Sequence, residues 1–568
     1  MVRRSTVDLV EAEALSPDAG IAFEYELPRE GGRRPDVVIV TPTDVVVLEF
    51  KQKDHAGVAD IDQVAAYARD LANYHSGCRE QSVLPVLVPT RRTGADEKRD
   101  GVWVTTGEGL SNRIRSLLAE DGVDGVDIKR WIEAEYMPLP TLVEAARLVF
   151  EREPLPNIRR AHSAGIPDVV NYLHSVVEEA SKGEERHLVL VTGVPGAGKT
   201  LVGIQFVYSR TLTSNDTTNA GVLLSGNGPL VEVLRYTLHS KTFIQDIRNF
   251  RREYAVRGKI PHEHVIVFDE AQRAWDVERM ETENLLVSEP EFLLDAAGRT
   301  PGWAVVVGLI GSGQEIHHGE EAGLPQWNEA LQAVGDRGAD WIVHVPEALE
   351  REFTHSTSVR RREHLALSSS LRTHLALDVQ IWIEQLLVAD LDECQRLSCG
   401  IRAQGFNLHL TRDLDTAKAY ARARYADHPG KRFGLVASSK AANLPVYGVP
   451  NSFQALKRLK KGPWFVDAPS SPNSCCQLRT VATEFECQGL ELDLPIVCWG
   501  DDMWMQDGQW RSKLLPRKAH DPKRLRLNSY RVLLSRGRDG LVIWVPPEAS
   551  LTETYDTLAN AGAMVMDA

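Results

Sequence analysis

The chain has 568 residues, of which 43% are hydrophobic and 25% are charged, and its formal net charge is −14. A length prior of about 150 residues per domain predicts three or four domains, and the composition is that of a soluble globular protein. The negative charge excludes a nucleic-acid binder that depends on bulk positive charge, but it leaves room for a local basic groove.

The seven cysteines form no CxxC pair and no Cys/His metal-ligand spacing, which favours reduced thiols. Arg3 and Arg4 are followed by acidic residues rather than by the apolar core of a signal peptide. Further along, no apolar run is long enough to span a membrane. We therefore expect a cytoplasmic protein without a membrane partner, and its oligomeric state stays open.

Residues 1–150 are predicted to form the first domain. Its expected elements are a helix at 6–15, strands at 21–27, 35–40 and 45–51, a helix at 60–74 and a strand at 83–88. Turns rich in glycine and proline separate the first three strands, which indicates a β-meander. The polar segment 151–165 contains two prolines and is predicted to be a linker.

Charged residues stand at the ends of two of these strands. Asp36 lies at the start of the second strand, and Glu49 and Lys51 follow thirteen and fifteen residues later at the end of the third. Residues two apart on a strand share a face, so Glu49 and Lys51 point the same way. The apolar run Val45–Leu48 looks buried, and charged groups at its end are expected to have a polar purpose.

This order of residues resembles the PD-(D/E)XK nuclease fold of the RecB-like kind. The resemblance implies that Asp36 and Glu49 hold one or two Mg²⁺ ions and that Lys51 orients or activates the attacking water. The alternative is an exposed hairpin that carries an ordinary Glu49–Lys51 charge pair. The order of the motifs and their spacing across a turn favour the nuclease.

A QxxxY helix is typical of the RecB-like members, and Gln63 and Tyr67 provide it here. The two side chains are four residues apart and share one helix face, where they could touch substrate or brace the site. The family pattern also includes an upstream glutamate on the first helix. Glu11 is the candidate for this ligand, with Glu13 as the alternative.

From residue 166 to residue 350, apolar strands alternate with amphipathic helices, which indicates βαβ units and a parallel sheet. The strand at 187–192 runs into GVPGAGKT, the GxxxxGK[ST] phosphate-binding pattern, in the required strand–loop–helix context. Lys199 would neutralise β- and γ-phosphate oxygens, and the Thr200 hydroxyl would ligate Mg²⁺. The predicted nucleotide-binding residues of this loop are Gly193, Pro195, Gly196, Gly198, Lys199 and Thr200.

A second strand, at 265–268, ends in two carboxylates. Asp269 can hold Mg²⁺ through water, and Glu270 can polarise the attacking water. Parallel sheets place ligands at the carboxyl ends of their strands, and burying both carboxylates without a cation would be costly. Together with the phosphate loop, this pair predicts ATP hydrolysis with ATP and Mg²⁺ as cofactors.

The order of further motifs resembles superfamily-1 helicases. The resembling segments are 221–227 (motif Ia), DEAQ at 269–272 (motif II), 303–308 with 311–316 (motif III), 371–372 (motif IV), 483–491 (motif V) and 530–538 (motif VI). The resemblance implies an α/β fold with two RecA-like P-loop lobes, at 166–350 and 351–568. The restriction-endonuclease-like α/β domain precedes them.

The helicase pattern also assigns roles to single residues. Gln314 is in the position that senses the γ-phosphate, and Arg372 and Arg536 are the cations that reach it across the cleft between the lobes. Gln488 and Gly489, in motif V, are predicted to contact the nucleotide. In isolation, each arginine would be read as a surface or salt-bridge residue. We find no Q-motif glutamine before the phosphate loop, so specificity for adenine is implied only by the resemblance.

Three stretches give a narrower resemblance. GQEIHHGEEAG, ASSKA at 437–441 and LLSRGRDG at 533–540 resemble the DUF2075 family, the helicase-like domain also found at the C-terminus of long Schlafen proteins. The segment 460–476 is rich in proline and serine and is predicted to be an exposed loop. Tryptophans such as Trp464 could stack on bases, but core positions are the better prediction for them.

These observations predict an ATP-driven nucleic-acid translocase fused to a metal-dependent nuclease. Nucleic acid is the expected partner, with DNA favoured over RNA, and the family resemblance fits DNA processing or defence against foreign nucleic acid. Two alternatives stay open. One is a switch or remodeller whose N-terminal domain grips nucleic acid without cutting it, and the other is an RNA-directed enzyme.

Overall fold

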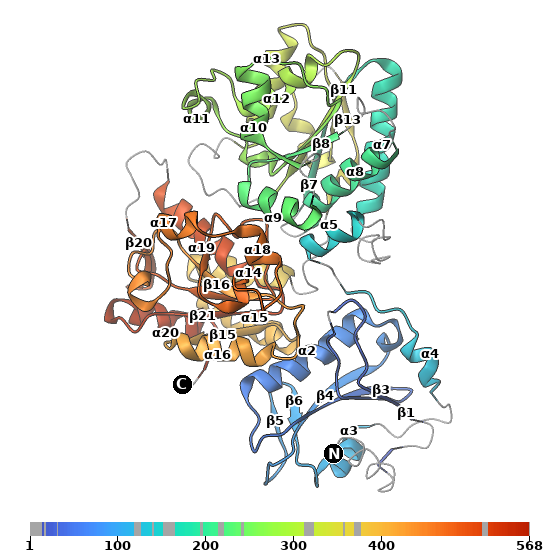
Figure 1. The fold of residues 1–568 in the computed structure, drawn as a ribbon, viewed down its shortest axis with the longest axis vertical. Helices are drawn as coiled ribbons and strands as arrows, with labels where there is room; N and C mark the ends of the chain where they lie inside the picture. The colour runs from blue at the N-terminus through green and yellow to red at the C-terminus, as the bar shows by residue number, and fades with distance from the viewer. Residues whose placement is uncertain are drawn as a thin grey trace.

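The computed structural model describes residues 14–15, 19–30, 32–118, 126–138, 141–150, 165–193, 197–213, 221–239, 244–311, 323–355, 358–367, 376–513 and 521–566. Within them, the protein is an α/β fold of three bodies, each built around one large sheet. Figure 1 shows the N-terminal domain in blue at the bottom, a green lobe 1 at the top and an orange to red lobe 2 beside and between them.

The N-terminal domain contains a six-stranded sheet in the order β1-β2-β3-β4-β6-β5. The first three strands pair antiparallel, as the predicted meander requires, and β4 pairs parallel with β3. Parallel neighbours need a crossover connection, and α2 (Val58–Tyr74) provides it. The strands are β1 (Gly20–Phe23), β2 (Val37–Val40), β3 (Asp44–Lys51), β4 (Ser82–Pro89), β5 (Glu97–Arg99) and β6 (Val102–Val104).

Two helices cover opposite faces of this sheet. Alternate residues of β2 and β3 pack on α2, and the others pack on α3 (Leu110–Leu117). The strands are therefore buried on both faces, which explains why they are continuous apolar runs rather than alternating ones. A short helix, α4 (Ile128–Ile132), packs on β1.

Lobe 1 is a parallel sheet in the order β13-β12-β7-β11-β10-β8-β9, and β14 pairs with the end of β7. The strand that precedes the phosphate loop, β7, is separated from β10 by one strand, which is the arrangement of a RecA-like lobe. The strands are β7 (Arg186–Gly193), β8 (Gly221–Ser225), β9 (Ile244–Asp246), β10 (Val265–Asp269), β11 (Ala304–Ile310), β12 (Ile342–Val345), β13 (Ser358–Arg361) and β14 (Ala366–Leu367). The helices are α7 (Ile166–Gly183), α8 (Lys199–Thr213), α9 (Gly228–Leu238), α10 (Ile247–Arg251), α11 (Val277–Glu281), α12 (Glu289–Gly298) and α13 (Pro325–Gly335).

Lobe 1 extends beyond the predicted boundaries on both sides. Strands β13 and β14 lie after residue 350 but pair with β12 and β7. On the other side, α5 (Leu142–Phe150) packs against α8 and α9 of lobe 1, with Ala145 and Ala146 in the core. Both segments join lobe 1 because their apolar side chains and backbone groups find partners there.

Lobe 2 is a second parallel sheet, in the order β17-β16-β18-β21-β15-β22, with a separate hairpin. Its strands are β15 (Asn407–Thr411), β16 (Phe433–Ala437), β17 (Val481–Thr483), β18 (Leu494–Cys498), β21 (Gly540–Trp544) and β22 (Met564–Val565), and the hairpin joins β19 (Met503–Gln506) to β20 (Gln509–Ser512). Its helices are α14 (Ala376–Val388), α15 (Leu391–Ala403), α16 (Leu414–Arg424), α17 (Phe453–Lys457), α18 (Lys461–Val466), α19 (Pro522–Leu534) and α20 (Thr552–Asn560). Across the described parts of all three bodies, no helix combines the length and apolarity that a membrane crossing needs.

The segment 460–476 is not the exposed loop that its composition predicts. It contains α18, and Trp464, Cys475 and Cys476 are buried. The Trp464 indole donates a hydrogen bond to the Thr480 hydroxyl (3.0 Å), which satisfies its polar edge inside the core. The prolines and serines mislead because the segment depends on a few large apolar anchors rather than on a periodic pattern.

Helix α2 packs on lobe 2 as well as on its own sheet, and Figure 1 shows it beside α16. Buried Asp62 accepts hydrogen bonds from His409 Nε2 (2.7 Å) and the Tyr420 hydroxyl (2.5 Å). Burial by itself would raise the pKa of the Asp62 carboxyl, but His409 and its hydrogen bond hold that pKa below its usual value. A second contact joins Arg69 to Asp539 of lobe 2 (3.0 Å).

The Asp62→Ala variant is expected to unfold more easily, by about 3–5 kcal/mol, because it leaves buried polar partners without their carboxylate. Thermal unfolding of the full chain, followed by calorimetry, measures the shift of the transition that contains lobe 2. Asp54→Ala is the matched control because the Asp54 side chain is 78% exposed. An equal unfolding temperature in both variants would contradict the importance of this interface.

Candidate functional site

The residues predicted to bind the phosphates of ATP come together at the carboxyl end of the lobe 1 sheet. Strand β7 ends at Gly193, and α8 begins at Lys199. Lys199 Nζ donates to the Gly193 carbonyl (2.7 Å), and the Thr200 hydroxyl donates to both carboxylate oxygens of Asp269 (3.1 Å each). Gly198 has φ +87°, which favours glycine at this position. Pro195 and Gly196 lie outside the described residues.

Asp269 and Glu270 stand at the end of β10, next to this loop. Burial, and then the charge of Glu270, raise the pKa of the Asp269 carboxyl. Glu270 has φ +57°, a left-handed conformation that is uncommon outside glycine and is often found at functional sites. Two carboxylates beside a threonine hydroxyl form an all-oxygen donor set, and a Mg²⁺ ion would offset the cost of burying them.

Gln272 is a residue of this site to which the sequence analysis gave no role. Its side chain is buried, and its amide nitrogen donates to the Glu270 carboxylate (2.5 Å). Its amide oxygen accepts from the backbone N–H of Gly311 (2.7 Å), at the end of β11. Gln272 therefore links the end of β10 to the start of predicted motif III. In the sequence, the only indication of this role is that Gln272 is the glutamine that ends the DEAQ pattern. Gln314 lies outside the described residues.

Predicted motifs Ia and V meet between the two lobes. Asn227 begins α9, and its side-chain oxygen accepts from the Leu230 N–H (3.2 Å). Its amide nitrogen donates to the Gln488 carbonyl of lobe 2 (2.5 Å). Gly489 has φ +72°, and a Cβ on it would lie 3.2 Å from that nitrogen. The glycine thus allows the close approach of the lobes.

The structure places Arg536 inside lobe 2. It is 1% exposed, and its guanidinium donates to the backbone carbonyls of Cys487 (3.3 Å) and Leu490 (3.2 Å). These bonds brace the motif V turn that carries Gln488 and Gly489. Contact between Arg536 and a γ-phosphate stays a prediction and would require an exchange of these hydrogen bonds. Arg372 lies outside the described residues.

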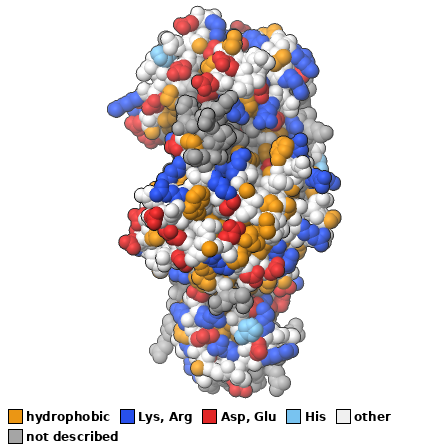
Figure 2. Space-filling model, turned by 90° about the vertical axis from the view of Figure 1, so that its left-hand side faces the viewer, with side chains coloured by type: hydrophobic (Ala, Val, Ile, Leu, Met, Phe, Trp, Pro, Cys, Tyr) orange, Lys and Arg blue, Asp and Glu red, His pale blue; other side chains and the backbone are white. Residues whose placement is uncertain are grey.

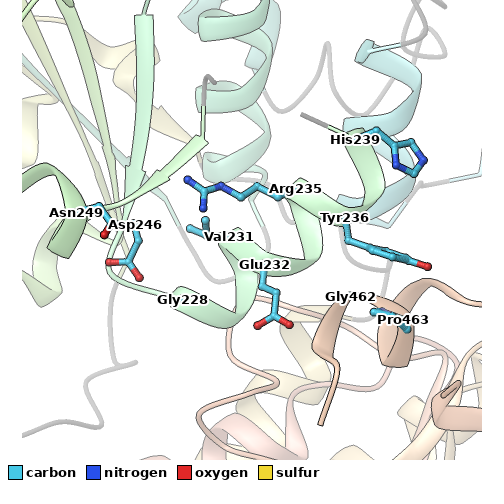
Figure 3. Close-up of a pocket in the computed structure, with 10 residues that line it drawn as sticks. All are labelled: Gly228, Val231, Glu232, Arg235, Tyr236, His239, Asp246, Asn249, Gly462 and Pro463. Carbon is cyan, nitrogen blue, oxygen red and sulfur yellow. The ribbon is translucent and has the colours of Figure 1, made fainter. Parts of the chain in front are cut away.

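A pocket of about 630 Å³ opens between the lobes next to the Asn227 contact. Figure 3 shows Arg235, Tyr236 and His239 projecting from α9, with Gly462 and Pro463 of α18 opposite. The Tyr236 hydroxyl donates to Asp467 of lobe 2 (2.8 Å). This pocket is lined by Gly228, Val231, Glu232, Arg235, Tyr236, His239, Asp246, Asn249, Gly462 and Pro463.

The N-terminal domain brings its three predicted catalytic residues together. Lys51 Nζ lies 3.0 Å from Glu49 Oε1, so the two side chains share a face of β3 as expected. Asp36 Oδ2 accepts from the Phe50 N–H (2.7 Å), and the Asp36 N–H lies 3.4 Å from Glu49 Oε2. This close pairing follows from the antiparallel register of β2 and β3, which sets Val37 opposite Leu48.

The environment of this pair disfavours negative charge. Burial, and then the neighbouring Asp36, raise the pKa of Glu49 from 4.5 to about 7. Burial also raises the pKa of Asp36. Two carboxylates with raised pKa values beside one lysine fit a divalent cation, which would favour their charged forms. Among the described residues, no group of three or more His, Cys, Asp or Glu side chains could hold a metal, and Glu11 and Glu13 lie outside them.

Gln63 and Tyr67 lie against this pair, on the helix face that the QxxxY spacing predicts. The Gln63 amide nitrogen lies 3.4 Å from Glu49 Oε1 and 3.2 Å from the Tyr67 hydroxyl. Both side chains are buried, so they brace the carboxylate from within. A neighbour from lobe 2, His428, contacts both of them and carries no signal in the sequence. No local pattern could reveal it, because the contact spans 365 residues.

Comparisons with known proteins identify the family to which the two lobes are similar. Residues 186–547 match the family described as "Schlafen group 3, DNA/RNA helicase domain". The Hef helicase domain of Pyrococcus furiosus is 12% identical, with 68% of this chain and 97% of that chain covered and a TM-score of 0.26. A structure of Pif1 helicases at forked double-stranded DNA is 13% identical, with 70% and 97% covered and a TM-score of 0.25.

At these TM-scores, neither solved structure carries an argument about this chain. The search of the curated proteins found no match. The family match covers well over half of the chain. It spans most of both lobes and includes the phosphate loop, Asp269 and Arg536. The chain therefore belongs to the family of Schlafen group 3 DNA/RNA helicase domains.

Proposed function

We propose that this helicase-family ATPase is an ATP-driven nucleic-acid translocase whose N-terminal domain is a metal-dependent nuclease of the PD-(D/E)XK kind. The observation that carries the proposal is the cluster of Asp36, Glu49 and Lys51 on two neighbouring strands. In this reading, the motor moves the strand and the N-terminal domain cuts it, with DNA as the favoured substrate.

The motor half depends on the lobe 1 residues at the ends of β7 and β10. Lys199 would face the β- and γ-phosphates, and Thr200 with Asp269 would hold Mg²⁺. Glu270, held by Gln272, would accept a proton from the attacking water. The contact between Asn227 and Gln488 would let lobe 2 respond to the nucleotide, because Asn227 follows β8, whose last residue, Ser225, lies opposite Asp269.

The nuclease half depends on the charges around Glu49. A divalent cation held by Asp36 and Glu49 would lower the pKa of a bound water and polarise a phosphodiester oxygen. Lys51 lies 3.0 Å from Glu49 and keeps a partly exposed side chain, so it can orient the water or neutralise charge that develops on the phosphate. Gln63 and Tyr67 keep Glu49 in place.

A nucleic-acid substrate must bind to a chain whose net charge is −14. Figure 2 shows Lys and Arg side chains gathering at a hollow between the uppermost body and the middle one, although acidic side chains are spread over the same face. A local basic hollow suffices because phosphate contacts are short-range at physiological salt. This distribution supports binding of a strand across the two lobes.

The decisive experiment is a cleavage assay on single- and double-stranded DNA and RNA, in Mg²⁺ or EDTA, with and without ATP. We expect Mg²⁺-dependent cleavage by the native chain, more on DNA than on RNA, and its loss in the Asp36→Ala variant. ATPase activity of the variant should match that of the native chain, because Asp36 lies in another body.

Cleavage that survives in Asp36→Ala would refute the assignment of the nuclease site. If no substrate is cut while nucleic acid still stimulates the ATPase, the N-terminal domain grips without cutting and the protein is a switch or remodeller. Stronger stimulation and cleavage with RNA than with DNA would make it an RNA-directed enzyme.

A further inference from the structure

The loop between α16 and β16 of lobe 2 reaches the N-terminal domain. It contains residues 425–432, and it lies where α16 packs against α2. Helix α2 is the element that carries Gln63 and Tyr67. The predicted nuclease site therefore has lobe 2 as a neighbour, and one side chain of this loop enters the cluster.

That side chain is His428. Its Nε2 atom lies 3.2 Å from the Tyr67 hydroxyl and 3.3 Å from the Gln63 amide nitrogen. The rings of Tyr67 and His428 meet edge to face, with 5.8 Å between their centres. From the other side, the Arg33 guanidinium lies 5.2 Å from the centre of the Tyr67 ring. Tyr67 is thus held between a residue of its own domain and a residue of lobe 2.

The protonation state of the His428 ring allows its Nε2 atom to accept a hydrogen bond. Burial, and then the charges of Arg33, Lys431 and Arg424, lower the pKa of His428 to about 3, so the ring is neutral at physiological pH. When Nε2 accepts from the Tyr67 hydroxyl, which itself accepts from Gln63, the ring proton sits on Nδ1.

The loop that carries His428 is held in place by contacts to both bodies. Lys431 forms ion pairs with Asp493 (2.9 Å) and Asp539 (3.3 Å) of lobe 2, and its Nζ lies 3.5 Å from Glu30 of the N-terminal domain. The position of His428 is therefore fixed from both sides of the interface.

We propose that His428 is a positioning residue of the nuclease site, supplied by lobe 2, which holds Gln63 and Tyr67 against Glu49. The proposal rests on the proposed nuclease function and goes beyond it, because the site then consists of residues from two bodies. Its chemical consequence concerns metal binding. Without His428, the Tyr67 hydroxyl loses its acceptor, and Gln63, which donates both to that hydroxyl and to Glu49 Oε1, is less firmly oriented. The carboxylate is then less well placed for a divalent cation.

The test compares three variants of the full chain with the native protein. His428→Ala removes the contact, and His428→Gln offers an amide at the position of Nε2. His409→Ala is the matched control, because it removes another buried histidine of the same interface, which contacts Asp62 rather than the nuclease cluster. Mn²⁺ affinity is measured by titration calorimetry with Asp36→Ala as the blank, together with single-turnover cleavage, ATPase activity and the unfolding temperature.

We expect His428→Ala to weaken Mn²⁺ binding and cleavage by roughly 10- to 100-fold, as losses of supporting residues around a metal commonly do. His428→Gln should recover most of both, and ATPase activity should not change. His409→Ala should lower the unfolding temperature and leave Mn²⁺ binding and cleavage unaltered below it. A purely structural role would make His428→Ala behave like His409→Ala, and this result would overturn the proposal.

The two proposals can fail separately. If the native chain binds Mn²⁺ through Asp36 but cuts no substrate, the nuclease function fails, and the Mn²⁺ affinities still decide whether His428 positions the cluster. If Mn²⁺ binding does not depend on Asp36, both proposals are overturned. If cleavage and Mn²⁺ affinity are the same in His428→Ala as in the native chain, only the role of His428 is refuted.

Discussion

Lys199→Ala is expected to reduce ATP hydrolysis by at least roughly 10²–10³-fold, the usual cost of removing one preorganised group that stabilises transition-state charge. Lys199 Nζ is held by the Gly193 carbonyl (2.7 Å) at the mouth of the phosphate loop, where it would neutralise the β- and γ-phosphates. The measurement is steady-state ATPase activity at saturating single-stranded nucleic acid. Lys182→Ala is the control, because the Lys182 side chain is 80% exposed on α7.

The same variant also separates the two halves of the proposed function. Lys199 lies in lobe 1, and Asp36 and Glu49 lie in the N-terminal domain, so Mg²⁺-dependent cleavage of a short single strand should persist in Lys199→Ala. Cleavage of a long substrate that requires translocation should fall with the ATPase. ATPase activity within ten-fold of the native value would remove Lys199 from the phosphate site.

The local parts of both sites could be predicted because each depends on short-range patterns. A buried apolar strand that runs into a glycine-rich loop predicts β7 and α8, and the structure contains both. Likewise, two strands joined by a tight turn must pair in one register, which brings Asp36 beside Glu49. A four-residue spacing puts Gln63 and Tyr67 on one face of α2, and they contact each other there.

Contacts between distant segments could not be predicted in this way. The pairing of β14 with the end of β7 could not be predicted, because β14 carries no local mark of its partner. The buried residues Asp62, His409 and Tyr420 come from two helices and a strand that share no pattern in the sequence, although they join two bodies. A single sequence contains the periodicity of each element but not the identity of the element that will cover it.

Function and stability are in conflict at Glu49, and the Glu49→Gln variant should expose the conflict. The glutamine keeps the size of the side chain but removes a charge that Asp36 and burial disfavour. Loss of this predicted metal ligand should weaken cleavage by about 10²–10³-fold, since metal stabilisation of the transition state contributes several kcal/mol. In EDTA, however, the variant should be more stable than the native chain at alkaline pH.

The sign follows from the pKa of Glu49, which is 4.5 in an ordinary environment and about 7 in the folded chain. The folded state binds this proton more tightly, so the resulting stability is full below pH 4.5 and is lost as the pH rises to and through 7. The loss is roughly 3 kcal/mol by pH 8, and Glu49→Gln avoids it. Thermal unfolding at pH 5 and pH 8 measures the difference, with Glu80→Gln as the exposed control. A variant that is less stable at both pH values would mean that Glu49 forms a structural ion pair with Lys51. The electrostatic argument for a cation between Asp36 and Glu49 would then fail.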